Sequence, residues 1–104
     1  MVLYHVKYTL DKDKAEAYMK FAKDVAIPHW LSTPGLKEFR GYRETGTLNI
    51  LVELEFDSFT SWGKALDDPK TKDVMTKTIM CAHDMCWTLW DKSPVIPEPL
   101  KPKK

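Results

Sequence analysis

Residues 34–62 read PGLKEFRGYRETGTLNILVELEFDSFTSW, and this stretch decides the fold. It predicts a strand over 36–45 and a second over 48–56, joined by a tight turn at which Gly46 can take a positive φ. Apolar side chains alternate with other side chains in the second strand, so one face of it is expected to be buried. That face carries Leu48, Ile50, Val52, Leu54 and Phe56. Asp57 or Ser58 can cap a helix predicted over 59–66.

The flanking segments predict the remaining elements. Residues 2–8 form a strand with Val2, Tyr4, Val6 and Tyr8 on one face, and residues 12–27 switch to helical periodicity. The apolar stripe of that helix is Ala15, Tyr18, Met19, Ala22, Val25 and Ala26. Pro28 should end or kink the helix, leaving His29, Trp30 and Leu31 in a short turn. Another helix starts at Asp68-Pro69, with a buried stripe of Val74, Met75, Ile79 and Ala82, and residues 85–91 form the last strand.

This order, β-α-β-β-α-β, predicts an α+β protein of the ferredoxin-like plait, with a four-stranded antiparallel sheet. Residues 1–92 form the domain, since 104 residues provide for one modest core. Residues 93–104 contain four prolines and three lysines, which favours an extended tail that either wraps a partner subunit or hangs free.

Charge and composition exclude several classes of function. The 16 basic and 15 acidic residues leave a formal charge of +1, which does not indicate a nucleic-acid partner. No apolar stretch approaches the ~20 residues that cross a bilayer, so no membrane partner is expected. No secretory signal pattern precedes the first strand, and Cys81 and Cys86 lack Cys-x-x-Cys spacing. We therefore expect a cytoplasmic protein with reduced thiols and no metal site.

The plait leaves one face of its sheet without helices, and the sequence indicates what covers it. Strand residues on that face are His5, Lys7, Asn49, Leu51, Glu53 and Glu55. If the first and third strands are neighbours, His5 and Lys7 can pair with Glu53 and Glu55 across them. The natural cover for such a face is the sheet of a second subunit, so we expect a homodimer formed through these residues.

The chain resembles the dimeric α+β barrel superfamily, and within it the antibiotic-biosynthesis-monooxygenase type, in which two plaits stack sheet on sheet. The resemblance covers residues 2–91. It is carried by PGLKEFRGYRE after the first helix, by VELEFDSFTSWGKAL from strand to helix, and by MCWTLWD in the last strand. The resemblance implies a homodimeric barrel. Members of the superfamily include cofactor-free oxygenases of phenols, heme-degrading oxygenases, lactone isomerases and proteins with no assigned reaction.

The heme-degrading branch can be compared with this sequence position by position. Trp62 fits the tryptophan expected early in the helix after the third strand. Val6 stands where that branch has an asparagine, and residues 72–75 contain no histidine for the iron. Two of three parts are missing, so heme degradation is disfavoured and no cofactor is expected.

A cofactor-free oxygenase needs an aromatic pocket and a group that favours the phenolate form of its substrate. The pocket between sheet and helices is expected to be lined by Tyr4, Tyr8, Trp62 and one or both of Trp87 and Trp90, although simple core packing also explains these aromatics. His29 and His83 are the catalytic candidates. A structural interpretation is favoured for both: a hydrogen-bonded, partly buried histidine for His29, and a residue at a helix C-terminus for His83.

Two functions follow from these expectations. One is a cofactor-independent monooxygenase acting on a small aromatic or phenolic compound. The alternative is a non-catalytic module of the same fold that binds a small apolar or aromatic ligand or serves assembly. Choosing the enzyme rests on analogy, because a fold alone does not define a reaction.

Overall fold

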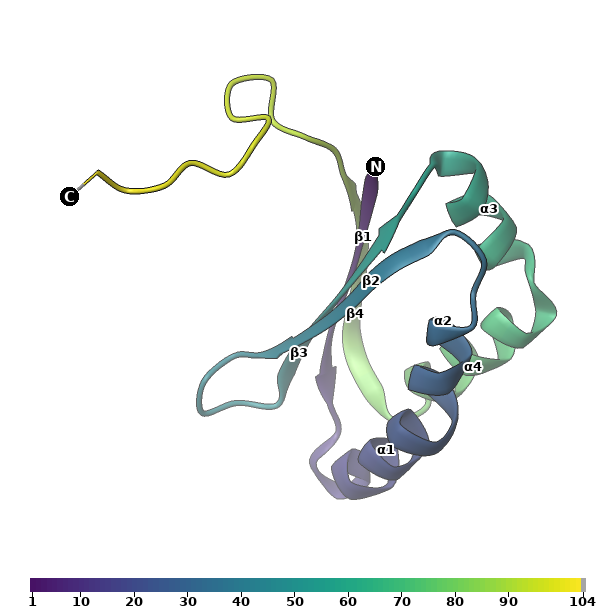
Figure 1. Cartoon of the computed structure of the whole chain (residues 1–104). Coiled ribbons are helices and arrows are strands. Elements are labelled where there is room, and N and C mark those ends of the chain that lie inside the picture. Colours follow the sequence, from purple (N-terminus) through teal and green to yellow (C-terminus); the bar gives the residue numbers. More distant parts are fainter. Residues whose placement is uncertain (104) are drawn as a thin grey trace.

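A four-stranded antiparallel sheet with the spatial order β2-β3-β1-β4 forms the centre of the structure, a computed structural model that describes residues 1–103. Its strands are β1 (Val2–Leu10), β2 (Leu36–Arg43), β3 (Asn49–Phe56) and β4 (Ala82–Trp90). Figure 1 shows all of the helices on the concave side of this sheet, so the opposite face is left open. The α+β ferredoxin-like plait predicted from the sequence is confirmed.

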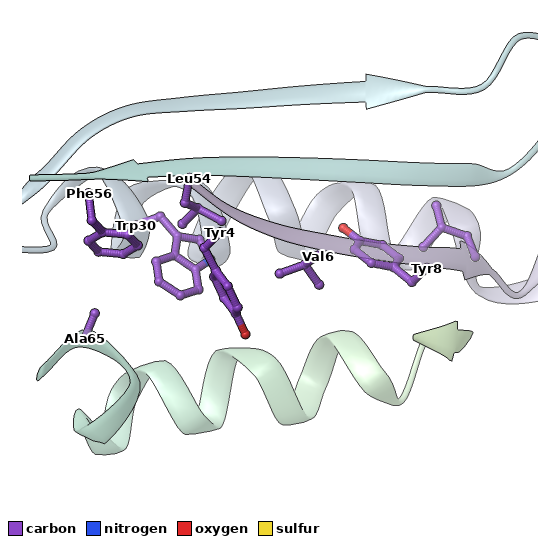
Figure 2. Close-up of a cluster of buried hydrophobic side chains, with 8 residues drawn as sticks. Tyr4, Val6, Tyr8, Trp30, Leu54, Phe56 and Ala65 are labelled. Carbon is purple, nitrogen blue, oxygen red and sulfur yellow. The ribbon is translucent and has the colours of Figure 1, made fainter. Parts of the chain in front are cut away.

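The hairpin and the strand faces also agree with the sequence pattern. Gly46 has a φ of +79° in the turn between β2 and β3. In β1, the side chains of Val2, Tyr4, Val6 and Tyr8 are buried, and in β3 those of Leu54 and Phe56 are fully buried. Figure 2 shows the side chains of β1 extending from the sheet toward the helices. Ala65, on the helix that follows β3, belongs to the same buried cluster as Phe56. The core therefore lies between the sheet and the helix layer.

The first helical segment is longer than expected. It consists of η1 (Lys12–Lys14), α1 (Ala15–Phe21), the π-helical η2 (Ala22–Ala26) and α2 (Ile27–Leu31). The prediction that the helix gives way to a short turn at Pro28 is wrong, because Pro28 lies inside α2. The π turn accounts for this: Ile27 N–H donates to the Ala22 carbonyl oxygen, five residues back, and the wider ladder accommodates a residue that lacks an N–H.

The π turn also changes which side chains face the sheet. Met19 and Val25, both expected in the buried stripe, are exposed. Tyr18, Ala22, Ala26 and Trp30, at a uniform spacing of four, face inward instead. A regular α-helix has 3.6 residues per turn, so residues spaced by four drift around its surface. Three successive spacings of four stay on one face only if the helix has a locally wider turn.

The remaining helices begin at side-chain caps. Ser58 Oγ accepts from Ser61 N–H at 3.1 Å ahead of α3 (Phe59–Asp67), and Asp68 Oδ1 accepts from Lys70 N–H at 3.0 Å ahead of α4 (Pro69–Ile79). Both helix starts were predicted. Within α4, Val74 is buried as expected, whereas Ile79 is exposed.

Gly35 joins α2 to the sheet in a conformation that other residues rarely adopt. Its φ is +85°, and a Cβ built on it would lie 2.4 Å from both Cβ and Oγ of Ser61. Its carbonyl oxygen accepts from Asp57 N–H at 2.9 Å. The glycine thus lets the start of β2, the end of β3 and the start of α3 approach one another closely.

The last strand begins earlier than expected. β4 starts at Ala82, so Ala82 and His83 belong to the sheet and not to the preceding helix. Asp84, at a φ of +54°, lies where the pairing of β1 with β4 shifts register. Residues 91–103 form no helix or strand and extend away from the sheet in Figure 1, and the last residue of the expected tail, Lys104, lies outside the described residues.

Within residues 1–103, no helix has both the length and the apolar character that a membrane crossing requires. The two cysteines are free thiols.

Candidate functional site

An apolar cavity of about 590 Å³ lies between the sheet and the helices. This volume falls within the range of small-molecule pockets, roughly 300–1,000 Å³. Its wall comes from α1, η2, α2 and α4 on one side and from all four strands on the other. Most of the strand positions face the helices, while Arg40 and Tyr42 of the edge strand β2 border the cavity from the open face. The principal side chains of the wall are Val6, Tyr8, Tyr18, Ala22, Ala26, Trp30, Phe39, Ile50, Val52, Leu54, Val74, Met75 and Met85.

Small residues explain why this space remains open. Ala22 and Ala26 face the cavity on the helix side, and Gly41 of β2 lines it on the sheet side. Gly41 is paired with Val52, so its missing side chain would project on the helix-facing side. A Cβ built there meets no atom within 4 Å. The cavity is therefore a consequence of sequence, because larger residues at these positions would fill it.

Two tyrosines place hydroxyl groups in this largely apolar wall. Tyr8 of β1 and Tyr18 of α1 are hydrogen-bonded to each other through their hydroxyl oxygens. Burial raises the pKa of Tyr8, and so does the neighbouring Tyr18; burial also raises the pKa of Tyr18. Both hydroxyls are therefore neutral near pH 7. The pair uses one of its two protons internally, so the other is available to a ligand oxygen.

Other aromatics predicted for the pocket lie elsewhere. Tyr4 and Trp62 pack edge to face in the core, with ring centroids 5.9 Å apart, and neither borders the cavity. Burial raises the pKa of Tyr4 to about 12. Trp62 Nε1 is buried and has no hydrogen-bond partner among residues 1–103. Of the five aromatics named from the sequence, Tyr8 alone lies in the wall.

The two tryptophans of β4 require a correction. Trp90 is paired with Leu3, on the open face of the sheet, and its ring lies 5.6 Å from that of His5. Trp87 is paired with Val6 on the helix-facing side, but it is 42% exposed and lies outside the cavity wall. β4 is an edge strand, and only its first part, at Met85, reaches the cavity.

His29 is buried between helices and does not face the cavity. Its Nε2 lies 2.7 Å from Thr71 Oγ1 of α4. His29 is 5% exposed and Thr71 is 0% exposed. Burial lowers the pKa of His29, an effect that the charge of Asp68 opposes in part. The structure thus fits the interpretation of His29 as a hydrogen-bonded structural histidine.

His29 makes the free energy of unfolding depend on pH. Because its folded-state pKa is below the unfolded value of about 6.5, the unfolded chain takes up a proton first as pH falls. Stability from this group is fully present above about pH 6.5 and is lost as pH falls below that value. In urea melts at pH 7.5, 6.5 and 5.5, the free energy of unfolding of His29→Gln should fall less across this range than that of the wild type. Equal losses in both proteins would contradict the assignment.

His83 also lies away from the cavity. It is the second residue of β4, and its Nδ1 lies 2.6 Å from Asp11 Oδ1 at the end of β1. The expectation of a helix C-terminal histidine is therefore wrong in position. Its ring is largely exposed, and its contact with the Asp11 carboxylate links the start of β4 to the end of β1.

The open face of the sheet carries an ionic network with Arg40 at its centre. Arg40 Nε donates to Glu53 Oε1 at 2.6 Å, Nη2 to Glu55 at 3.1 Å and Nη1 to Glu38 at 2.9 Å. His5 Nε2 lies 2.6 Å from Glu53 Oε2. Burial alone would favour the protonated carboxyl of Glu53, but the hydrogen bonds from Arg40 and His5 outweigh it and hold its pKa below the usual value.

This network corrects one expected pairing and confirms another. His5 contacts Glu53 as the sequence suggested, because the two residues are register partners. Lys7 is opposite Leu51, so it pairs with neither glutamate, and Arg40 takes that role. Asn49 is on the same face, where its amide contacts Thr9 and Glu44. Val6, at the position where a heme-degrading enzyme would have asparagine, faces the cavity with an apolar side chain.

Comparisons with known proteins agree with the fold. No protein-family model matches the chain, and no curated protein matches it. Among solved structures, a conserved protein from Methanosarcina mazei has a TM-score of 0.79 at 15% identity, over 88% of this chain and 92% of its own. A suggested antibiotic biosynthesis monooxygenase from Deinococcus radiodurans has a TM-score of 0.79 at 12% identity, over the whole of both chains. The chain thus shares the ferredoxin-like α+β fold of these structures.

One further structural neighbour has a stated activity. SnoaB, a cofactor-independent oxygenase from Streptomyces nogalater, has a TM-score of 0.76 at 18% identity, over 93% of this chain and 97% of its own. At such low identity, the likeness establishes the architecture and leaves the chemistry to be argued from the cavity.

Proposed function

We propose that this protein is a cofactor-independent monooxygenase that acts on a small aromatic or phenolic compound in the cavity between sheet and helices. The observation that carries the proposal is the apolar cavity of about 590 Å³ with the Tyr8–Tyr18 hydroxyl pair in its wall. The activity of SnoaB, which shares the fold, supports the same reaction class.

The cavity suits the demands of such a reaction. The substrate itself supplies the electrons, so the protein has to hold an electron-rich ring in a dry site and favour its oxyanion. Apolar side chains from sheet and helices provide the dry surroundings. The hydroxyl hydrogen that the tyrosine pair does not use internally can form a hydrogen bond to the substrate oxygen, which stabilises negative charge there as it develops.

Oxygen uptake tests this function directly. Purified protein, treated with a chelator and given no flavin or nicotinamide, is incubated with a panel of two-ring and three-ring phenols in an oxygen electrode. We expect uptake above the buffer rate for at least one compound, with one O₂ consumed per substrate. One oxygen atom should enter the product and the other should leave as water. Phenols that bind without accelerating uptake would contradict the oxygenase proposal.

A second function, binding without catalysis, is favoured by a specific observation. No histidine or carboxylate lies in the described cavity wall, and both tyrosine pKa values are raised, so neither tyrosine is a ready base. The groups of the described wall can orient an oxygen-bearing ring without removing its proton. The oxygen-electrode experiment separates this function from the first.

The open sheet face supports a homodimer. We infer that His5, Lys7, Asn49, Leu51, Glu53 and Glu55 meet their counterparts in a second copy, in a cytoplasmic setting with both thiols reduced. The face is partly apolar, and most of its charges are neutralised by neighbours on the same face, so it is suitable for burial against another sheet. Sedimentation equilibrium at micromolar concentration should give about twice the chain mass of 12.1 kDa. A mass of one chain would refute the dimer.

A further inference from the structure

The described part of the cavity wall contains two charged residues, one of which is ion-paired and one of which is not. Both are arginines of β2, Arg40 and Arg43, and no acidic residue borders the cavity. Register places Arg40 opposite Glu53 on the open face, where three carboxylates bind its guanidinium. Arg43 is paired with Ile50, on the helix-facing side. The charge of Arg40 is thus compensated on the other side of the sheet, and that of Arg43 is directed to the cavity side.

Arg43 forms no ion pair in the part of the chain that the structure describes, although it also lines a second hollow together with Glu44 and Asp84. Among residues 1–103, no carboxylate lies within 4.0 Å of its guanidinium. The adjacent Glu44 accepts instead from the Asn49 amide at 2.7 Å. Arg43 is exposed, as are Ile27, Leu31 and Tyr42, which border the same cavity. These four residues mark the place where the cavity opens to solvent.

We propose that the cavity selects aromatic anions, with the ring system enclosed by apolar side chains and an acidic group held at the opening by Arg43. The ligand class is an aromatic carboxylate or an acidic phenol that is ionised near pH 7. Guanidinium matches such oxygens with two parallel N–H donors, and its positive charge favours the ionised form. The tyrosine hydroxyls provide a second, neutral contact further along the wall. This inference deepens the proposed function and rests on the same cavity.

Calorimetric titration with a matched pair of probes tests the charge requirement. The probes are 2-naphthoate and 2-naphthalenemethanol, which share a ring system and differ in the negative charge. Wild-type protein should bind the carboxylate about tenfold more tightly, the effect of one charge-assisted contact at a solvent-exposed opening. The preference should weaken as ionic strength rises, because salt screens exposed charges.

Variants assign the preference to Arg43. Arg43→Gln should remove it and leave the affinity for the alcohol unchanged, and Arg43→Lys should restore part of it. Lys37→Gln is the matched control, because it removes one positive charge from the same strand at a position outside the cavity wall, and it should retain the wild-type preference. Loss of the preference in Lys37→Gln but not in Arg43→Gln would overturn the assignment.

The outcomes separate this inference from the oxygenase proposal. Equal affinity of wild type for both probes would overturn the anion preference and leave the cavity available for neutral phenols. Failure of both probes to bind would also overturn it. A carboxylate preference that depends on Arg43, together with no oxygen uptake on any phenol, would support the inference and reject the oxygenase.

Discussion

Replacing Gly41 with leucine is expected to abolish ligand binding in the cavity while the protein stays folded. The new side chain would project from β2 into the space between the sheet and η2, where a Cβ meets no atom within 4 Å. Unlike Gly35 and Gly46, Gly41 has no positive φ, so leucine fits its backbone. Naphthalene-sized ligands should bind at least about a hundredfold more weakly, a loss of about 2.7 kcal/mol.

Two measurements make this result specific. Calorimetry with 2-naphthoate reports binding, and the oxygen electrode reports any turnover. Gly63→Leu is the matched control, because a Cβ at Gly63 also meets open space but lies on α3, outside the cavity wall. Thermal melts should show both variants folded, and leucine in the strand should be neutral or stabilising, since glycine weakens strands. Undiminished binding in Gly41→Leu would place the ligand elsewhere.

Replacing Gly35 with alanine should destabilise the fold strongly. The residue would have to keep a left-handed backbone conformation, which costs about 1 kcal/mol or more, and its Cβ would overlap Ser61. Overpacking typically adds about 1–3 kcal/mol. A total of about 3 kcal/mol is large for a domain of this size, whose whole stability is on the order of 5–15 kcal/mol.

Gly46→Ala separates the two contributions to this loss. Gly46 also has a positive φ, but a Cβ there meets nothing within 4 Å. Urea melts should therefore show a loss of about 1 kcal/mol for Gly46→Ala and clearly more for Gly35→Ala. Equal losses would mean that the contact with Ser61 relaxes without cost.

The strands could be predicted because their side chains alternate in the sequence. The burial of Leu54 and Phe56 on one side, and the placement of Glu53 and Glu55 on the other, follow from the period of two. The starts of two helices could also be predicted, since Ser58 and Asp68-Pro69 are local N-capping signals. The π turn was not, because it depends on how Pro28 is accommodated within a packed helix. For that reason Met19 and Val25 were placed on the wrong side.

The cavity was harder to derive from the sequence than the fold. Its existence was expected, but Gly41 and Arg43 were not expected in its wall, and Tyr18 was expected in the buried stripe of the helix without a place in the pocket. The spacing of four from Tyr18 to Ala22, Ala26 and Trp30 was the available signal for the helix side. For β2, assigning alternate residues to the two faces would have placed Gly41 and Arg43 together. Trp90 was misplaced because its face depends on the register of an edge strand.

The four tryptophans occupy four different surroundings, which makes the molecule its own fluorescent reporter. Trp30 is buried in the cavity wall, Trp62 is packed on Tyr4, Trp87 is partly exposed beside the helices, and Trp90 lies on the open sheet face. An aromatic ligand would quench the emission of Trp30, whereas a subunit covering the open face would shift the emission of Trp90 to shorter wavelength. Occupancy and assembly thus have separate optical signatures in the unmodified chain.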